Sequence, residues 1–119
     1  MHIAIRTSQL VLQPDQRTQI ERRASFALSH LSAVVRRVDV SLSDVNGPRG
    51  GVDKRCRILV HVEGGSSVFV EDADSDLVQL IDRAMDRAGR AAHKRLEQAS
   101  AGRREQRAFR HLRTAIDSY

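Results

Sequence analysis

Four basic residues in the last third of the chain have the spacing of a single helical face. They follow one another at intervals of four, three and four residues: Arg83, Arg87, Arg90 and Lys94. At about 100° per residue, these intervals keep the side chains within about a 60° sector, along roughly 16 Å of helix. A row of cations of this length matches several successive phosphates, so the spacing predicts a face that binds a polyanion.

The net charge of the chain is concentrated around this row. It is +5 overall, and 18 of the 20 basic residues are arginine. Residues 1–82 contain 10 basic and 11 acidic side chains, whereas residues 83–119 contain 10 basic and 4 acidic ones. A positive field of this kind attracts nucleic acid, an anionic membrane surface or an acidic protein. Arginine favours phosphate in particular, because its planar fork can donate two parallel hydrogen bonds.

Other interpretations of the row stay open. A charged stripe is also typical of a solvated helix face, and Asp86 and Glu97 could neutralise part of it. A regulatory adaptor that binds an acidic protein is the main alternative to an RNA-binding protein. A membrane surface is disfavoured, because the apolar side of this helix is rich in alanine and is expected to pack in a core. Aromatic side chains are few, so any RNA should be held by its backbone and shape.

The sequence offers little support for catalysis. Cys56 lies on the apolar side of a predicted strand, and His61 lies on the opposite side. The five histidines have no metal-ligand spacing. Asp82 and Asp86 are one helical turn apart and could bind a hard cation, but they equally suit the helix dipole and neighbouring arginines. We therefore expect no enzyme, no cofactor and no metal site. An RNA-cleaving enzyme, with His61 or His93 as its base, is a third hypothesis.

Periodicity predicts the elements that must position these residues. Alternation of apolar and polar residues predicts strands, and apolar residues three or four apart predict helices. The expected strands are 2–6, 34–43, 54–63 and 66–72, and the expected helices are about 15–30 and 75–98. Gly64-Gly65 predicts a tight hairpin. The result is a two-layer α+β fold, β-α-β-β-β-α, in which both helices cover the apolar face of a four-stranded sheet.

The ends of the second helix and one loop carry their own predictions. Asp74 or Ser75 is expected to cap the helix, and Gly102 is expected to break it. Residues 99–119 would then be a basic tail behind a single domain of residues 1–98, and 103–116 could form a third helix. The segment NGPRGG at 46–51 resembles a weak glycine-rich phosphate loop but lacks the GK[ST] ending, which favours a mobile hairpin loop.

The lone cysteine and the apolar runs bear on the compartment. A single thiol without a disulfide framework suits a reducing cytosol. The N-terminal residues do not have the pattern of a secretory signal, and no apolar run approaches the ~20 residues that span a bilayer. We therefore expect a cytoplasmic protein.

Three short segments are similar to those of a known family. They are Leu80-Ile81-Asp82 with Asp86-Arg87, Arg90 and Lys94; Ile20-Glu21-Arg22-Arg23; and Val62-Glu63-Gly64-Gly65. Together with the element order, they resemble the bacterial ribosome hibernation-promoting factor family, which includes the ribosome-associated inhibitor. The resemblance covers about residues 1–98 and corresponds to the short form.

This resemblance implies a domain similar to double-stranded-RNA-binding folds, and a monomer that binds the small ribosomal subunit. Family members occupy the places of the tRNA anticodon stems and mRNA, and they silence translation in stationary phase or stress. The implied rRNA contacts are Arg22, Arg23, Arg87, Arg90 and Lys94. Arg83 belongs to the basic row but lies outside the family pattern, so it is a candidate RNA contact from spacing alone.

The chain also departs from the family pattern. Val78 stands near the place of a usual tyrosine, and the 46–51 loop is longer than typical. Residues 99–119 are too short to be the dimerising domain of the long form. Occlusion of tRNA and mRNA sites is therefore the implied mechanism, rather than ribosome dimerisation by a domain of its own.

Overall fold

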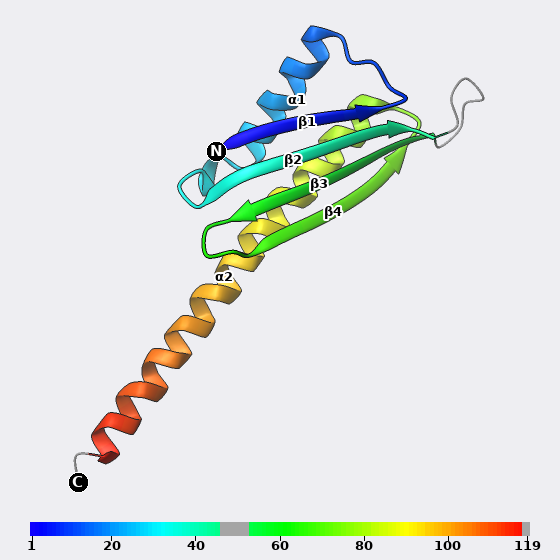
Figure 1. The fold of residues 1–119 in the computed structure, drawn as a ribbon. Helices are drawn as coiled ribbons and strands as arrows, with labels where there is room; N and C mark the ends of the chain where they lie inside the picture. Colours follow the sequence, from blue (N-terminus) through cyan, green and yellow to red (C-terminus); the bar gives the residue numbers. More distant parts are fainter. Residues whose placement is uncertain (46–52, 118–119) are drawn as a thin grey trace.

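The fold has one layer of sheet and one layer of helices (Figure 1). The structure is a computed structural model that describes residues 1–45 and 53–117, with side chains described as far as Gln98. The elements in chain order are β1 (His2–Ser8), α1 (Pro14–Ala27), a short 3₁₀ helix η1 (Ser29–Leu31), β2 (Val35–Asp44), β3 (Lys54–Val62), β4 (Ser67–Asp74) and α2 (Leu77–Asp117). The predicted β-α-β-β-β-α order is confirmed, and the segment 46–51 lies outside the described residues.

The strands are arranged in the order β1-β2-β3-β4. β1 pairs with β2 in parallel, through the crossover that contains α1, and the two later pairs are antiparallel. Alternation keeps one row of apolar side chains in register across the sheet: Ile5, Val40, Ile58 and Val70. Each of these side chains points to the same face because successive residues of a strand point to opposite faces. That face is the one the helices cover.

A single hydrophobic core lies between the two layers. The helices contribute fully buried residues at helical spacing, with Ala24 and Leu28 near the end of α1 and Leu80, Ala84 and Ala88 along α2. The sheet contributes the inward residues of β2 and β3. Burial of this apolar surface stabilises the fold by roughly 25 cal/mol per Å² removed from water.

The hairpin between β3 and β4 follows the prediction. Gly64 and Gly65 have φ angles of 91° and 86°, which lie in the left-handed region. Glycine adopts this conformation without the steric cost of a Cβ atom, so the two residues suit a tight turn. The Val62 amide closes the turn by donating a hydrogen bond to the Ser66 carbonyl oxygen over 2.9 Å.

The start of α2 corrects the predicted cap. Asp76 is the capping residue, because its Oδ1 accepts hydrogen bonds from the amides of Val78 and Gln79 over 2.9 and 3.2 Å. Asp74, one of the two predicted caps, instead accepts a hydrogen bond from the Asp76 amide over 3.0 Å. An aspartate here satisfies amides that the first turn of a helix leaves without partners.

The predicted break at Gly102 is wrong. α2 runs without interruption from Leu77 to Asp117, a helix of 41 residues that extends well beyond the sheet (Figure 1). One glycine costs a helix interior only about 1 kcal/mol, and the alanine, arginine, glutamate and glutamine around it favour a helix. There is accordingly no separate third helix at 103–116. The molecule measures 74 × 23 × 18 Å as a result, and in the described ranges no helix is long and apolar enough to span a bilayer.

The end of α1 lies close against α2 at Gly89. A Cβ atom added at this position would lie 2.7 Å from the carbonyl oxygen of Ala27, the last residue of α1. Real side chains do not approach a backbone atom so closely, so the contact requires a residue without a side chain. Gly89 therefore sets the distance between the end of α1 and the middle of α2.

Candidate nucleic-acid interface

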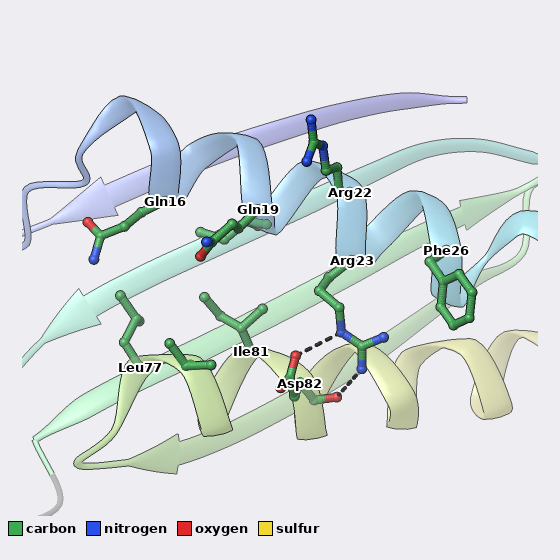
Figure 2. Close-up of a pocket in the computed structure, with 10 residues that line it drawn as sticks. Gln16, Gln19, Arg22, Arg23, Phe26, Leu77, Ile81 and Asp82 are labelled. Atoms are coloured by element: carbon green, nitrogen blue, oxygen red, sulfur yellow. Dashed lines mark hydrogen bonds and ion pairs between the residues drawn. The ribbon is translucent and has the colours of Figure 1, made fainter.

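The outer surfaces of α1 and α2 carry all six predicted RNA contacts, but the six side chains differ in exposure and in what they contact. Arg22 and Arg23 are neighbours on α1 and diverge (Figure 2). Arg22 is exposed and points away from α2. Arg23 points across to α2, where its Nε donates a hydrogen bond to Asp82 Oδ1 over 2.8 Å. Arg23 therefore joins the two helices, and Arg22 remains open to solvent.

A groove runs beside this bridge between the two helices (Figure 2). Its apolar lining includes Phe26 and Val78, which are 75% and 61% exposed. The Arg23 guanidinium carbon lies 6.0 Å from the centre of the Phe26 ring, at the limit of a cation–π contact. Val78 stands near the place of the family's usual tyrosine, so this groove is lined by an exposed valine at that point.

Arg83, the first member of the basic row, is held by the end of β4. Its Nε donates to Asp72 Oδ2 over 2.6 Å, and its Nη1 donates to Asp74 Oδ2 over 3.0 Å. Its Nη2 donates to Asp72 Oδ1 over 3.1 Å and to the Ala73 carbonyl oxygen over 3.0 Å. All three nitrogens of the guanidinium therefore face β4 and are engaged there.

These bonds also set the ionisation of the two aspartates. The Arg83 side chain is the main reason that the pKa of Asp72 falls to about 2, against an opposing effect of partial burial. The pKa of Asp74 is lowered first by the Asp76 amide and then by Arg83. Both carboxylates raise the pKa of Arg83 above its already high value. The cluster is thus charged at any physiological pH, and it ties α2 to the last strand.

Arg87, one turn later, also contacts β4. Its Nη1 donates to the Glu71 carbonyl oxygen over 3.1 Å and lies 3.4 Å from Asp72 Oδ2. The Arg87 guanidinium has fewer bonds than that of Arg83, and its side chain is 47% exposed. Arg87 therefore helps to hold the helix and still presents donors to solvent.

Arg90 and Lys94, the last two members of the row, differ from the first two. Both are exposed, and neither has an ion pair or side-chain hydrogen bond within the described part of the chain. Together they line a depression at the end of α1, which they share with His30 and His93 and with the acidic residues Asp86 and Glu97. Their ammonium and guanidinium donors are available to an external anion.

The partners of Arg83 are functional residues that the sequence reasoning missed. Asp72 and Asp74 share the parity of Val68 and Val70, so alternation along β4 places all four on the face that the helices cover. A carboxylate on such a face needs a cationic partner, because burying an unpaired charge is costly. The two aspartates at helix-facing positions of β4 were visible in the sequence, and they indicate a cationic partner such as an arginine of the covering helix.

Cys56 and His61 lie on opposite faces of the sheet. Cys56 is completely buried, and this burial raises the pKa of its thiol to about 12. Its predicted place in the core is confirmed. His61 lies on the uncovered face of the sheet, where its Nε2 is 2.9 Å from Asp39 Oδ2. In residues 1–45 and 53–98, no three histidine, cysteine or acidic side chains come together in a way that could hold a metal ion.

The fold and the site together define a small α+β protein with exposed basic side chains on the outside of its helical layer. The chain belongs to the family described as sigma 54 modulation protein / S30EA ribosomal protein, whose model matches residues 3–100. This membership confirms the resemblance to the hibernation-promoting factor family.

Two solved structures are similar to the chain. The N-terminal domain of Protein Y from Thermus thermophilus is 28% identical, with a TM-score of 0.60 over 75% of this chain and 92% of that domain. A ribosomal subunit interface protein from Coxiella burnetii is 15% identical, with a TM-score of 0.62 over 81% of this chain and 99% of that protein. The second likeness concerns the fold alone. A comparison with curated proteins gives no match.

Proposed function

We propose that this protein is a ribosome-associated translation inhibitor, a hibernation factor that binds rRNA of the small subunit in stationary phase or stress. The observation that carries the proposal is the exposed pair Arg90 and Lys94, which have no ion pair or side-chain hydrogen bond among the described residues of a chain in a family of ribosomal proteins. In this proposal the protein acts in the cytoplasm, as a monomer and without catalysis. Its bound form occupies the places of tRNA and mRNA and so prevents initiation.

The proposed contacts divide the six candidate residues by availability. Arg90 and Lys94 bind phosphates first, because binding breaks no bond within the described part of the protein. Arg22 adds a contact from the far side of α1, and Arg87 adds one from donors that β4 leaves open. Arg23 and Arg83 keep the helices in place, because their guanidinium groups are engaged within the protein. Recognition is therefore of the RNA backbone rather than of base sequence.

Co-sedimentation with purified 30S subunits through sucrose gradients, over a series of salt concentrations, tests this function. Each phosphate contact should contribute roughly 0.7–0.9 to the slope of log affinity against log salt, so three to four contacts give a slope of roughly −2 to −4. The same samples should show inhibition of translation in a reconstituted system.

The outcomes separate the proposed function from the adaptor hypothesis. Absence of co-sedimentation even at low salt would reject a ribosome-binding role. If the protein does not co-sediment but retains an acidic protein from a nuclease-treated lysate, the regulatory adaptor would be favoured. Sedimentation with a salt slope near zero would reject phosphate contacts as the basis of binding.

A further inference from the structure

Two histidines meet at the point where α1 ends against α2. The ring centres of His30, in η1, and His93, in α2, lie 5.5 Å apart with their planes tilted by 47°. They share a depression with Arg90 and Lys94. The close approach at Gly89 brings the end of α1 near enough to α2 for the two rings to meet. None of the family-like segments includes either histidine.

Among the described residues, the charged groups of this depression come mainly from α2. α2 contributes the cations Arg90 and Lys94 and the carboxylates Asp86 and Glu97. α1 contributes Ala27 to the lining, and its Arg23 reaches toward Asp86 with a separation of 4.0 Å.

These fixed charges nearly cancel. Glu97 Oε1 lies 3.0 Å from His93 Nε2, so this carboxylate competes with any external anion for the ring. With neutral rings, the two cations and two carboxylates of the lining sum to zero. The charge of the depression therefore depends on the two histidines.

We propose that this depression, named here the histidine pocket (His30, His93, Arg90 and Lys94), binds one RNA phosphate and binds it more tightly in acid. The inference rests on the proposed function and deepens it by naming a contact and its regulation. Protonation of both rings changes the lining from neutral to a charge of +2. Two adjacent imidazolium rings repel each other, and a phosphate beside both rings offsets this repulsion and can accept a hydrogen bond from each.

Thermodynamic linkage then gives the direction of the effect. If the bound phosphate favours the protonated rings, RNA binding must take up protons, and affinity must rise as pH falls through the range in which histidine titrates. A bound phosphate that favours the protonated rings over the neutral rings by about 1.4 kcal/mol raises the affinity about tenfold. We expect RNA to bind about tenfold more tightly at about pH 5.5 than at about pH 8.

The test is the affinity of the full chain for a short RNA hairpin, measured by fluorescence anisotropy with a dye insensitive to pH, at constant ionic strength. The variant His30→Gln with His93→Gln keeps hydrogen-bonding groups of similar size but cannot gain charge. It should lose most of the tenfold gain between about pH 8 and about pH 5.5. His61→Gln, on the uncovered face of the sheet, is the matched control and should keep the gain.

A second variant tests the role of the competing carboxylate. Glu97→Gln should raise the affinity for the hairpin several-fold at about pH 8, because the lining then carries a net positive charge before either ring is protonated. An unchanged affinity at about pH 8 would overturn the assignment of this pocket as the phosphate contact.

The results distinguish the two proposals. A hairpin that binds equally well across the pH range, or gains equally in natural protein and the double histidine variant, overturns the histidine pocket and leaves the ribosomal role intact. Failure to bind the hairpin or 30S subunits at any pH rejects the proposed function itself. Circular dichroism at both ends of the pH range establishes that each variant is folded.

Discussion

Residues 77–87 and residues 88–98 of α2 carry the same kind of basic side chains at the same spacing, yet they differ in what those side chains contact. In the first segment, Arg83 and Arg87 face acceptors of β4 at distances of 2.6–3.4 Å. In the second, Arg90 and Lys94 have no such partner among the described residues, although Ala88 and Ala92 of the same segment are still fully buried in the core. The β4 carboxylates that face the helix lie beside Arg83 and Arg87 only, so one helical face serves two purposes.

The difference teaches that a basic row on a helix is not one functional unit. Arginines above a sheet find its carboxylates and contribute to the attachment of the helix. Basic residues of the same helix that lie away from those carboxylates keep their donors for an external anion. The division follows from the sequence of β4, because its helix-facing carboxylates, Asp72 and Asp74, lie only at the end of the strand, after Val68 and Val70.

The strongest test of the division reverses the charges of the second segment. Arg90→Glu with Lys94→Glu should weaken binding to 30S subunits by about 100-fold, because two charge-assisted hydrogen bonds contribute about 1.5–3 kcal/mol each. The melting temperature should stay the same. Sedimentation and circular dichroism melting measure the two quantities.

The matched control for this variant reverses two exposed arginines of the strands. Arg6→Glu with Arg36→Glu has the same change in net charge but lies outside the helical layer. It should retain most of the binding. An equal loss in both variants would mean that RNA is attracted by net charge and not by the face assigned here.

Gly89 marks the boundary between the two segments, and adding a methyl group there should affect both. Gly89→Ala places a carbon 2.7 Å from the Ala27 carbonyl oxygen, and relief of such overpacking costs about 1–3 kcal/mol. The better helix propensity of alanine offsets up to about 1 kcal/mol. Chemical denaturation should show a net loss of about 1–2 kcal/mol. Equal or greater stability would mean that the helices separate freely at this point.

Removing the charge of Arg83 should affect the fold and spare the binding. Arg83→Gln leaves Asp72 and Asp74 beside each other without their cation, and the melting temperature should fall by a few degrees. Affinity for 30S subunits should change by less than about twofold once the salt dependence is taken into account. A loss of binding comparable to that of the Arg90 and Lys94 variant would place Arg83 among the RNA contacts.

The smallest expected effect is an acid-labile contribution from Asp72. Its pKa in the folded protein is about 2, below the ordinary value of 3.8. A depressed pKa means that the contribution to stability is complete above about pH 4 and is lost as pH falls toward about 2. Asp72→Asn removes this titration, so the stability difference between natural protein and variant should shrink over that range. Parallel curves of unfolding free energy against pH would contradict the assignment.

Much of the fold could be predicted because its signals are local. Alternation in β2 and β3 and the glycine pair of the hairpin predicted those elements to within a few residues. The error at Gly102 arose because one glycine was weighed without the helix-forming residues around it. The capping residue was also predicted wrongly. Asp74, Ser75 and Asp76 are all suitable capping residues by type, and the sequence alone does not show that Asp74 accepts a hydrogen bond from Arg83 instead.

The candidate site was less accessible to prediction because its members are distinguished by tertiary contacts. Spacing placed Arg83 and Arg90 in the same row, and only the position of β4 separates them. Arg22 and Arg23 are adjacent on α1, and only the crossing of α2 turns one of them into a bridge. The meeting of His30 and His93 depends on Gly89, whose role is visible only when both helices are in place.

The uninterrupted α2 has a consequence for how the protein behaves in solution. A compact chain of 119 residues has a radius of gyration of about 13.5 Å, whereas this molecule has one of 19.1 Å. Such a rod-like particle diffuses slowly for its mass of 13.3 kDa. It should therefore elute from a gel-filtration column ahead of globular standards of equal mass, at the position of a larger particle. Light scattering, which measures mass independently of shape, will give the oligomeric state that elution volume would overestimate.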